Sequence, residues 1–237
     1  MHRKLLNLAR DNAGKGSGIR SEVAGDVATI YVYDIIDGFW GVSAADMAKT
    51  LAGITAPNIA LRINCPGGDV FEARAMMTAI AEHPATVTAK IDGLAASAAS
   101  VLALAASSVE IAEGGFFMIH NAWTFALGNA GDLRTTADLL DKVDGSLVAD
   151  YVARSGKPAD EIAAWMKAET WFNAQEAVDA GFADSVMPTS AKAKASAFNL
   201  AAYGNAPKAL TEKQPEIDEA ARQRSLARLG LYERTAA

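Results

Sequence analysis

Four short segments of this sequence carry the residue types that nucleophilic catalysis needs. They are residues 64–69 (NCPGGD), 93–100 (GLAASAAS), 116–121 (FFMIHN) and 167–173 (KAETWFN). Together they supply glycine-flanked backbone amides, a serine hydroxyl, an imidazole and a carboxylate. These are the groups of a serine hydrolase, in which a base activates a hydroxyl and amide donors hold the oxyanion.

The first two segments lie where a strand pattern gives way to a helix pattern. In residues 64–69, two glycines let the backbone approach a ligand closely, which suits an oxyanion hole, although the same residues also fit a plain tight turn. The segment lacks the phosphate-loop pattern. In residues 93–100, Ser97 could present its hydroxyl at a sharp turn, with the Ala98 amide beside it. The run is not G-x-S-x-G, and Ser97 taken alone fits a helix N-cap equally well. Ser100 is the weaker candidate because it falls inside the helix.

The last two segments offer a base and an acid. The chain has three histidines, and His120 follows a strand of large apolar residues, whereas His2 lies in a polar arm and His83 at a helix end. A histidine at a strand end serves either as a general base or as a satisfied core residue. Glu169 precedes an aromatic run and could orient an imidazole, but taken alone it also fits an ordinary surface acid.

The elements that must position these residues alternate along the chain. Strand patterns cover residues 26–33, 59–63, 86–91, 109–112 and 116–119, and helix patterns begin at 43 and cover 70–81 and 97–106. Such alternation favours an α/β fold with parallel strands. Residues 131–154 have apolar positions at helical spacing and predict a long amphipathic helix that ends at Ser155-Gly156. Asn173 caps a further short helix.

Composition narrows the function classes. The 237 residues are 51% hydrophobic, so a sizeable core can be buried. One cysteine and three histidines argue against a disulfide framework and a metal centre, so we expect no cofactor. A net charge of −6 argues against nucleic-acid binding. No apolar run approaches the roughly 18 residues of a membrane span, and no signal-peptide pattern opens the chain, so we expect a cytoplasmic protein with no membrane partner.

Three regions are predicted. Residues 1–24 are polar and glycine-containing and indicate a flexible N-terminal arm, and residues 25–187 form the globular domain. Residues 188–237 differ in composition, with eight Lys and Arg against five Asp and Glu. Within them, 188–207 is rich in Ala, Ser and Lys and is typical of a linker, while 215–232 could form one amphipathic helix.

Taken together and in this order, the four segments resemble the ClpP-like serine peptidases of the ClpP/crotonase superfamily. The resemblance lies in NCPGG at 64–68, GLAAS at 93–97, MIH at 118–120 and ETWFNAQEA at 169–177, and extends over residues 25–187. It implies the family's ββα superhelix, with residues 131–154 as its long protruding handle helix and a ring-type homo-oligomer.

The resemblance also implies a role for each site residue. Ser97 is then the nucleophile, His120 the general base, and the amides of Gly68 and Ala98 the oxyanion hole. Glu169 falls at the third position of the triad, where the housekeeping family usually has Asp. Thr170 is the local alternative for that position.

Within the superfamily, the sequence looks most like the ClpP-like head maturation (prohead) proteases of tailed phages. The grounds are RINCPGGDVFEA at 62–73, ETWFNAQEAVDAGFAD at 169–184 and the Ala/Lys-rich tail. This resemblance implies scaffold and capsid proteins as substrates, in the host cytoplasm.

Four alternatives stay open at this point. They are a housekeeping-type Clp proteolytic subunit, a Ser–Lys peptidase that uses Lys90, a catalytically silent assembly subunit, and a crotonase-type acyl-CoA enzyme.

Overall fold

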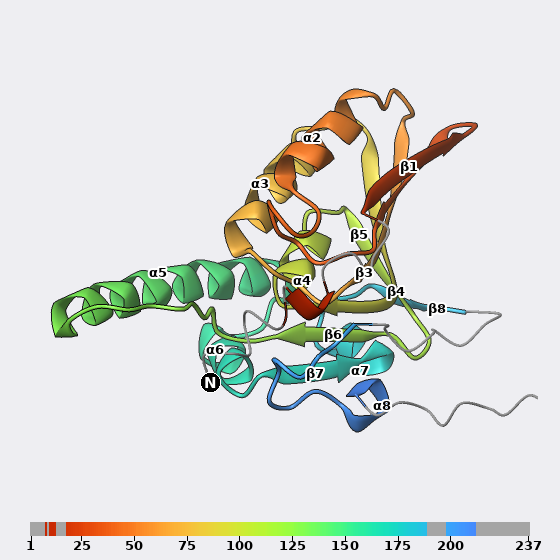
Figure 1. Ribbon diagram of the computed structural model, residues 1–237. Coiled ribbons are helices and arrows are strands. Elements are labelled where there is room, and N and C mark those ends of the chain that lie inside the picture. Colours follow the sequence, from red (N-terminus) through yellow and green to blue (C-terminus); the bar gives the residue numbers. More distant parts are fainter. Residues whose placement is uncertain (1–7, 9, 13–17, 189–197, 212–237) are drawn as a thin grey trace, which may run out of the picture.

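The structure, a computed structural model, describes residues 8, 10–12, 18–188 and 198–211 (Figure 1). In this part of the chain one eight-stranded sheet forms the centre. Its parallel strands are β2 (Val27–Val32), β3 (Asn58–Cys65), β4 (Thr86–Ala96), β5 (Ser108–Ala112) and β8 (Ser185–Met187), and β1 (Ile19–Ala24) pairs antiparallel with β2. The predicted α/β class with parallel strands is therefore confirmed.

Strand β4 divides the sheet between two neighbours. Its first half pairs with β5, whereas Leu94–Ala96 pair in parallel with β6 (Phe116–Ile119). Beyond β6 the sheet continues antiparallel into β7 (Thr170–Asn173). The sequence predicted this strand over residues 86–91, but β4 runs through Gly93 to Ala96. This extension matters for the site because it carries the chain to Ser97 directly beside the end of β6.

Helices α2 (Ala44–Ala52), α3 (Val70–Ala81) and α4 (Ala98–Ala103) lie on one side of strands β2 to β4 (Figure 1). Successive side chains of a strand point to opposite faces of the sheet. In β2, Ala28, Ile30 and Val32 point toward these helices and are fully buried, while the residues between them are partly exposed. Helix α2 follows Ser43, the N-cap that the sequence predicted, and Ser43 forms a capping box with Asp46.

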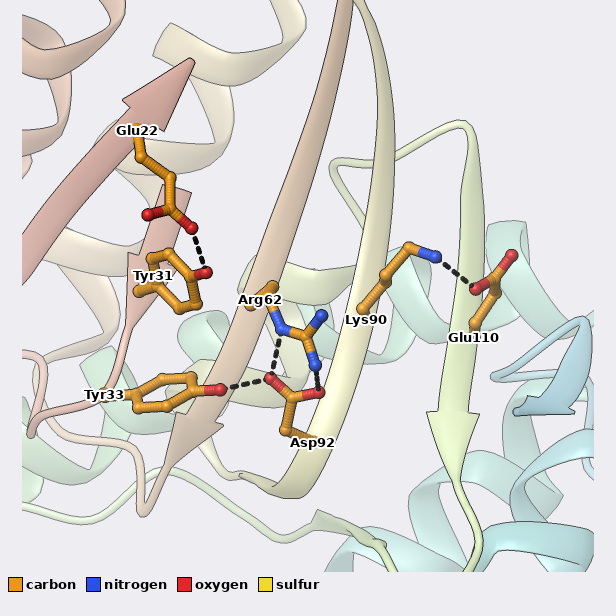
Figure 2. Close-up of polar contacts among 7 residues, drawn as sticks. All are labelled: Glu22, Tyr31, Tyr33, Arg62, Lys90, Asp92 and Glu110. Atoms are coloured by element: carbon orange, nitrogen blue, oxygen red, sulfur yellow. Dashed lines mark hydrogen bonds and ion pairs between the residues drawn. The ribbon is translucent and has the colours of Figure 1, made fainter. Parts of the chain in front are cut away.

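The opposite face of the sheet carries a row of polar side chains (Figure 2). Arg62 donates from Nε to Asp92 Oδ2 at 2.8 Å, and the Tyr33 hydroxyl donates to the same carboxylate. Burial, with the hydrogen bond to Asp92, raises the pKa of Tyr33 to about 12. One strand further on, Lys90 Nζ pairs with Glu110 at 2.9 Å. Lys90 therefore points away from the helices and from the turn that holds Ser97.

Helix α5 (Ala130–Ser155) projects from the body of the molecule (Figure 1). Its N-terminus has an Asn129–Asp132 capping box, and Gly156 ends it in the left-handed conformation with φ 68°. In this helix only Leu147 and Tyr151, near its C-terminal end, are buried. The predicted long protruding helix is confirmed, and its outer turns leave Leu133 and Leu139 about half exposed.

Helices α6 (Ala159–Lys167) and α7 (Ala174–Asp179) flank β7, and Asn173 caps α7 as predicted. The description resumes at residue 198, and the last described residues form the short helix α8 (Lys208–Thr211). Phe198, Leu200, Ala202 and Tyr203 are buried in a second apolar cluster with Leu8, Ile35, Leu94, Ala96 and Met118. No helix of the described residues is long and apolar enough to cross a membrane.

Two regional predictions differ from these observations. Residues 19–24 were predicted in a flexible arm, but they form β1, whose Arg20 guanidinium lies 3.6 Å from the centre of the Tyr31 ring. Residues 198–207 were predicted in a linker, but their large apolar side chains are buried in the second apolar cluster. The predicted helix at 215–232 lies outside the described residues.

Candidate active site

Ser97 occupies a strained turn between β4 and α4. Its backbone has φ 55° and ψ −125°, which is unusual for a residue other than glycine and costs on the order of 1–3 kcal/mol. The turn is held by the Ser97 amide, which donates to the Met118 carbonyl at 2.9 Å, and by the Ser100 hydroxyl, which donates to the Ser97 carbonyl at 2.6 Å. Ser97 makes no side-chain N-cap bond. Its hydroxyl is therefore available for other partners.

His120 lies directly across from Ser97. The pairing of Ala96 with Met118 places the residues that follow β4 and β6 side by side, and His120 Nε2 lies 2.7 Å from Ser97 Oγ. The ring stands edge-on to the Trp123 and Tyr203 rings, with centroids 5.8 Å and 5.5 Å away. Burial lowers the pKa of His120 to about 4, although the nearby charge of Glu169 acts to raise it. The imidazole is neutral at pH 7 and able to accept the Ser97 proton.

Glu169 faces this pair without a hydrogen bond to it. Its carboxylate oxygens accept bonds from the amides of Gly204 at 2.9 Å and Asn205 at 2.7 Å, and from the Trp171 indole at 3.3 Å. In the described part of the chain no hydrogen bond joins Glu169 to the His120 ring, so their interaction is electrostatic. The alternative, Thr170, donates its hydroxyl to the Trp165 carbonyl at 2.7 Å.

The backbone amides of Gly68 and Ala98, expected to form an oxyanion hole, have no acceptor among the described residues. Both residues line the same cavity as Ser97 and His120. Gly67 and Gly68 have φ 96° and 146°. A Cβ on Gly67 would lie 2.7 Å from Ser97 Cβ, and one on Gly68 would lie 1.9 Å from the Ile36 carbonyl oxygen. Only glycine allows this loop to approach the serine so closely.

The cavity has a volume of about 370 Å³ and opens beside the serine. Its far wall is the base of α5, with Leu140, Val143 and Leu147. Further apolar groups come from Val70 and Phe71 at the start of α3. The cavity is lined mostly by apolar side chains with a few polar groups, which is the lining typical of a ligand pocket.

The other candidate residues have structural roles. His83 uses both ring nitrogens, Nε2 towards the Ile54 carbonyl and Nδ1 towards the Ala85 amide, each at 3.2 Å. The Ser100 hydroxyl is buried against the Tyr151 hydroxyl at 2.7 Å. Burial raises the pKa of the Cys65 thiol to about 12, so this cysteine stays neutral and is no nucleophile. His2 lies outside the described residues.

A family model described as Clp protease matches residues 43–190 of the chain. The ATP-dependent Clp protease proteolytic subunit 1 of Protochlamydia amoebophila (strain UWE25) is 32% identical over 170 residues, which cover 68% of this chain and 81% of the relative. The chain belongs to the Clp protease family. Proteolytic subunit 1 of Chlamydia abortus (strain DSM 27085 / S26/3) is 32% identical over 153 residues, covering 61% and 80% of the two chains. The same subunit of Leifsonia xyli subsp. xyli (strain CTCB07) is 29% identical over 145 residues, covering 60% and 74%.

Membership of the Clp protease family confirms the predicted ClpP-like fold and supports a serine peptidase. The matched region runs from the N-cap of α2 to just beyond β8, so it contains Ser97, His120 and Glu169. It leaves out residues 198–211. The more specific resemblance to phage head maturation proteases stays a prediction, because the relatives are named as Clp proteolytic subunits.

Sequence reasoning missed one residue of this neighbourhood. Tyr203 contacts His120 and comes from the region predicted to be a linker. A short run, FNLAAYGN at 198–205, was the available signal, since its large apolar residues and its Gly-Asn pair stand out from the Ala/Lys-rich residues before it. The high Ala, Ser and Lys content of residues 188–207 as a whole predicted a linker and masked this short apolar run.

Proposed function

We propose that this protein is a serine endopeptidase that hydrolyses peptide bonds through an acyl-enzyme on Ser97. The observation that carries the proposal is the 2.7 Å contact between Ser97 Oγ and His120 Nε2, in a strained turn beside two amides that have no acceptor among the described residues. This combination offers nucleophile, base and oxyanion donors around one point in a cavity.

In the proposed reaction, neutral His120 accepts the hydroxyl proton as Ser97 attacks the scissile carbonyl. The amides of Gly68 and Ala98 stabilise the oxyanion of the tetrahedral intermediate. Collapse expels the amine, which takes the proton from His120 and leaves the acyl-enzyme. Water then attacks the ester with His120 again acting as base, which releases the acid and restores Ser97. No metal or nucleotide takes part in these steps.

We assign Glu169 an electrostatic role in this cycle. Its carboxylate is fixed by two backbone amides and an indole, and its charge favours the protonated imidazole that forms during attack. Because no hydrogen bond fixes the His120 Nδ1 position from this side, Glu169 is expected to contribute less than Ser97 or His120.

The Ser–Lys alternative finds no support in the site, since Lys90 pairs with Glu110 on the other face of the sheet (Figure 2). A crotonase-type acyl-CoA enzyme also needs paired amides, but it does not need the serine–histidine contact. A silent assembly subunit would not need a strained serine at all. These differences favour the peptidase.

For assembly, we propose a homo-oligomer of the ring type. Two features support it. Apolar residues of α5 are exposed, and the chain belongs to a family whose members are named as proteolytic subunits. The first candidate class of substrates is proteins delivered by a Clp-type ATPase, because the relatives are named ATP-dependent. Phage scaffold and capsid proteins are the second candidate, supported by the resemblance of residues 62–73 and 169–184.

Incubation with casein, a Clp ATPase and ATP, and separately with capsid and scaffold proteins alone, distinguishes the two substrate classes. Products that require the ATPase favour the first class, and cleavage of scaffold protein without ATP favours the second. Ser97→Ala is the control in both arms. Cleavage that persists in this variant at the wild-type rate would exclude the proposed mechanism.

A further inference from the structure

Residues 198–206 form a segment that lies beyond the family match yet docks on the candidate site. Leu200 and Tyr203 are 2% and 5% exposed, respectively. A reciprocal pair of hydrogen bonds anchors the segment: the Asn199 amide donates to Asn12 Oδ1 at 2.6 Å, and Asn12 Nδ2 donates to the Asn199 carbonyl at 2.9 Å. Asn12 is itself fully buried. A segment fixed in this way can hold other groups in place.

Tyr203 contacts both halves of the proposed catalytic machinery. Its ring stands edge-on to His120, at 5.5 Å between centroids and 81° between planes, and its other neighbours are Trp123 and Trp171. Its hydroxyl donates to the carbonyl of Pro66, the residue that precedes the two loop glycines. Burial raises the pKa of Tyr203 far above its usual range, so the hydroxyl stays protonated and keeps this donor.

The two residues after Tyr203 hold the acid. The Gly204 and Asn205 amides bond the two oxygens of Glu169, and Asn205 Nδ2 donates to the Ala168 carbonyl at 2.7 Å. Three consecutive residues of one segment thus contact the imidazole, the loop that carries the Gly68 amide, and the carboxylate. Tyr203 does not line the cavity beside Ser97, so the segment supports the site from behind and leaves the cavity open.

We propose that Tyr203 is a positioning residue of the peptidase site, fixing the His120 ring and the Pro66–Gly68 loop, and that residues 198–206 are a built-in part of the active centre. This inference rests on the proposed function. In this role Tyr203 acts through His120, through the loop and through the Ser97 side chain, whose hydrogen bond acts to lower the pKa of Tyr203 against the effect of burial.

Two consequences follow for His120. The ring of Tyr203 keeps water from the imidazole, so its removal should let the pKa of His120 rise towards the ordinary value. The titratable groups that face His120 are Ser97 from the β4–α4 turn, Glu169 from the α6–β7 connection and Tyr203 itself. The Tyr203 hydroxyl stays neutral, so the loss of its ring changes hydration without removing a charge.

The test uses the full chain with Tyr203→Ala and Tyr203→Phe. Tyr31→Phe is the matched control, because it removes a tyrosine hydroxyl on the polar face of the sheet (Figure 2). The readouts are kcat and KM on a peptide substrate, the rate of labelling by a fluorophosphonate from pH 4 to 9, and the titration of His120 by NMR.

For Tyr203→Ala we expect kcat to fall about 10²-fold with little change in KM, since a displacement of about 1 Å in a catalytic group costs this much. The acid limb of the labelling profile should move to higher pH. Tyr203→Phe keeps the ring, so its acid limb should stay with the wild type while kcat falls about tenfold or less from loss of one hydrogen bond.

Kinetics and a His120 titration for Tyr203→Ala that equal those of the wild type and of Tyr31→Phe would overturn the inference. If Tyr203→Ala does not fold, Tyr203→Phe decides: a wild-type kcat in that variant overturns the role assigned to the hydroxyl and to the loop. The NMR titration needs no activity, so it tests the packing of Tyr203 on His120 even if the wild type fails to label, and that failure would count against the proposed function alone.

Discussion

Replacing Gly68 by alanine tests the oxyanion loop. A Cβ at this position would lie 1.9 Å from the Ile36 carbonyl oxygen, whereas side-chain carbons essentially never approach another atom within 3.0 Å. The loop or the β2–α2 connection must therefore move by about 1 Å, the displacement that typically costs 10²-fold in rate. The same Ile36 carbonyl accepts the Asp69 amide at 2.8 Å, and the Ile36 amide donates to the Gly67 carbonyl at 2.9 Å, so the shift disturbs both anchors of the loop.

We expect Gly68→Ala to lower kcat by 10²–10³, the effect of losing one oxyanion donor, or about 2.7–4 kcal/mol. The assay is peptide hydrolysis, with urea denaturation to establish that the variant is folded. Gly145→Ala in α5 is the matched control, because a Cβ there meets nothing within 4 Å. That variant should gain about 0.5–1 kcal/mol in free energy of unfolding and keep full activity. A folded Gly68→Ala variant with kcat near the wild-type value would refute the argument.

Three further predictions concern charge. Because burial lowers the pKa of His120 to about 4 and the base must be neutral, activity should persist below the ordinary titration range of histidine and fall only as the pH drops through about 4, as a pH–rate profile of kcat/KM will show. Glu169→Gln removes the charge that favours the imidazolium, so kcat should fall about tenfold and the acid limb should move further down, and an unchanged profile would contradict the electrostatic role. Lys90→Met breaks the ion pair with Glu110, whose two side chains are 31% and 32% exposed. The variant should keep wild-type activity and change the free energy of unfolding by no more than about 1 kcal/mol, whereas a Ser–Lys enzyme would lose activity.

Local sequence signals were sufficient for the elements around the site. The β-branched strand at 26–33, the Ser43 and Asn173 caps and the Gly156 stop each depend on a few neighbouring residues, and each appears in the structure. Ser97 lies close to His120 because β4 and β6 end beside each other, and the resemblance to the ClpP-like peptidases implied this proximity. Sequence could not give the length of β4, because Gly93 is tolerated where a strand is buried between two partners.

The remainder of the site depends on contacts between distant residues. The pairing of Asn12 with Asn199 and the bonds from Gly204 and Asn205 to Glu169 join positions tens to hundreds of residues apart, for which composition holds no signal. The resemblance placed Glu169 at the third position of a triad, but two of its three hydrogen bonds come from Gly204 and Asn205, which no local pattern places beside it. The same contacts bring Tyr203 to the imidazole.

The central claim is that Ser97, activated by His120, is the nucleophile. The most direct test is labelling of the full chain with a fluorophosphonate, followed by peptide mass spectrometry of the wild type, Ser97→Ala and His120→Gln. The account predicts one adduct, on Ser97, in the wild type, none in Ser97→Ala and a greatly slowed reaction in His120→Gln. An adduct on another residue, or labelling of Ser97→Ala at the wild-type rate, would contradict it.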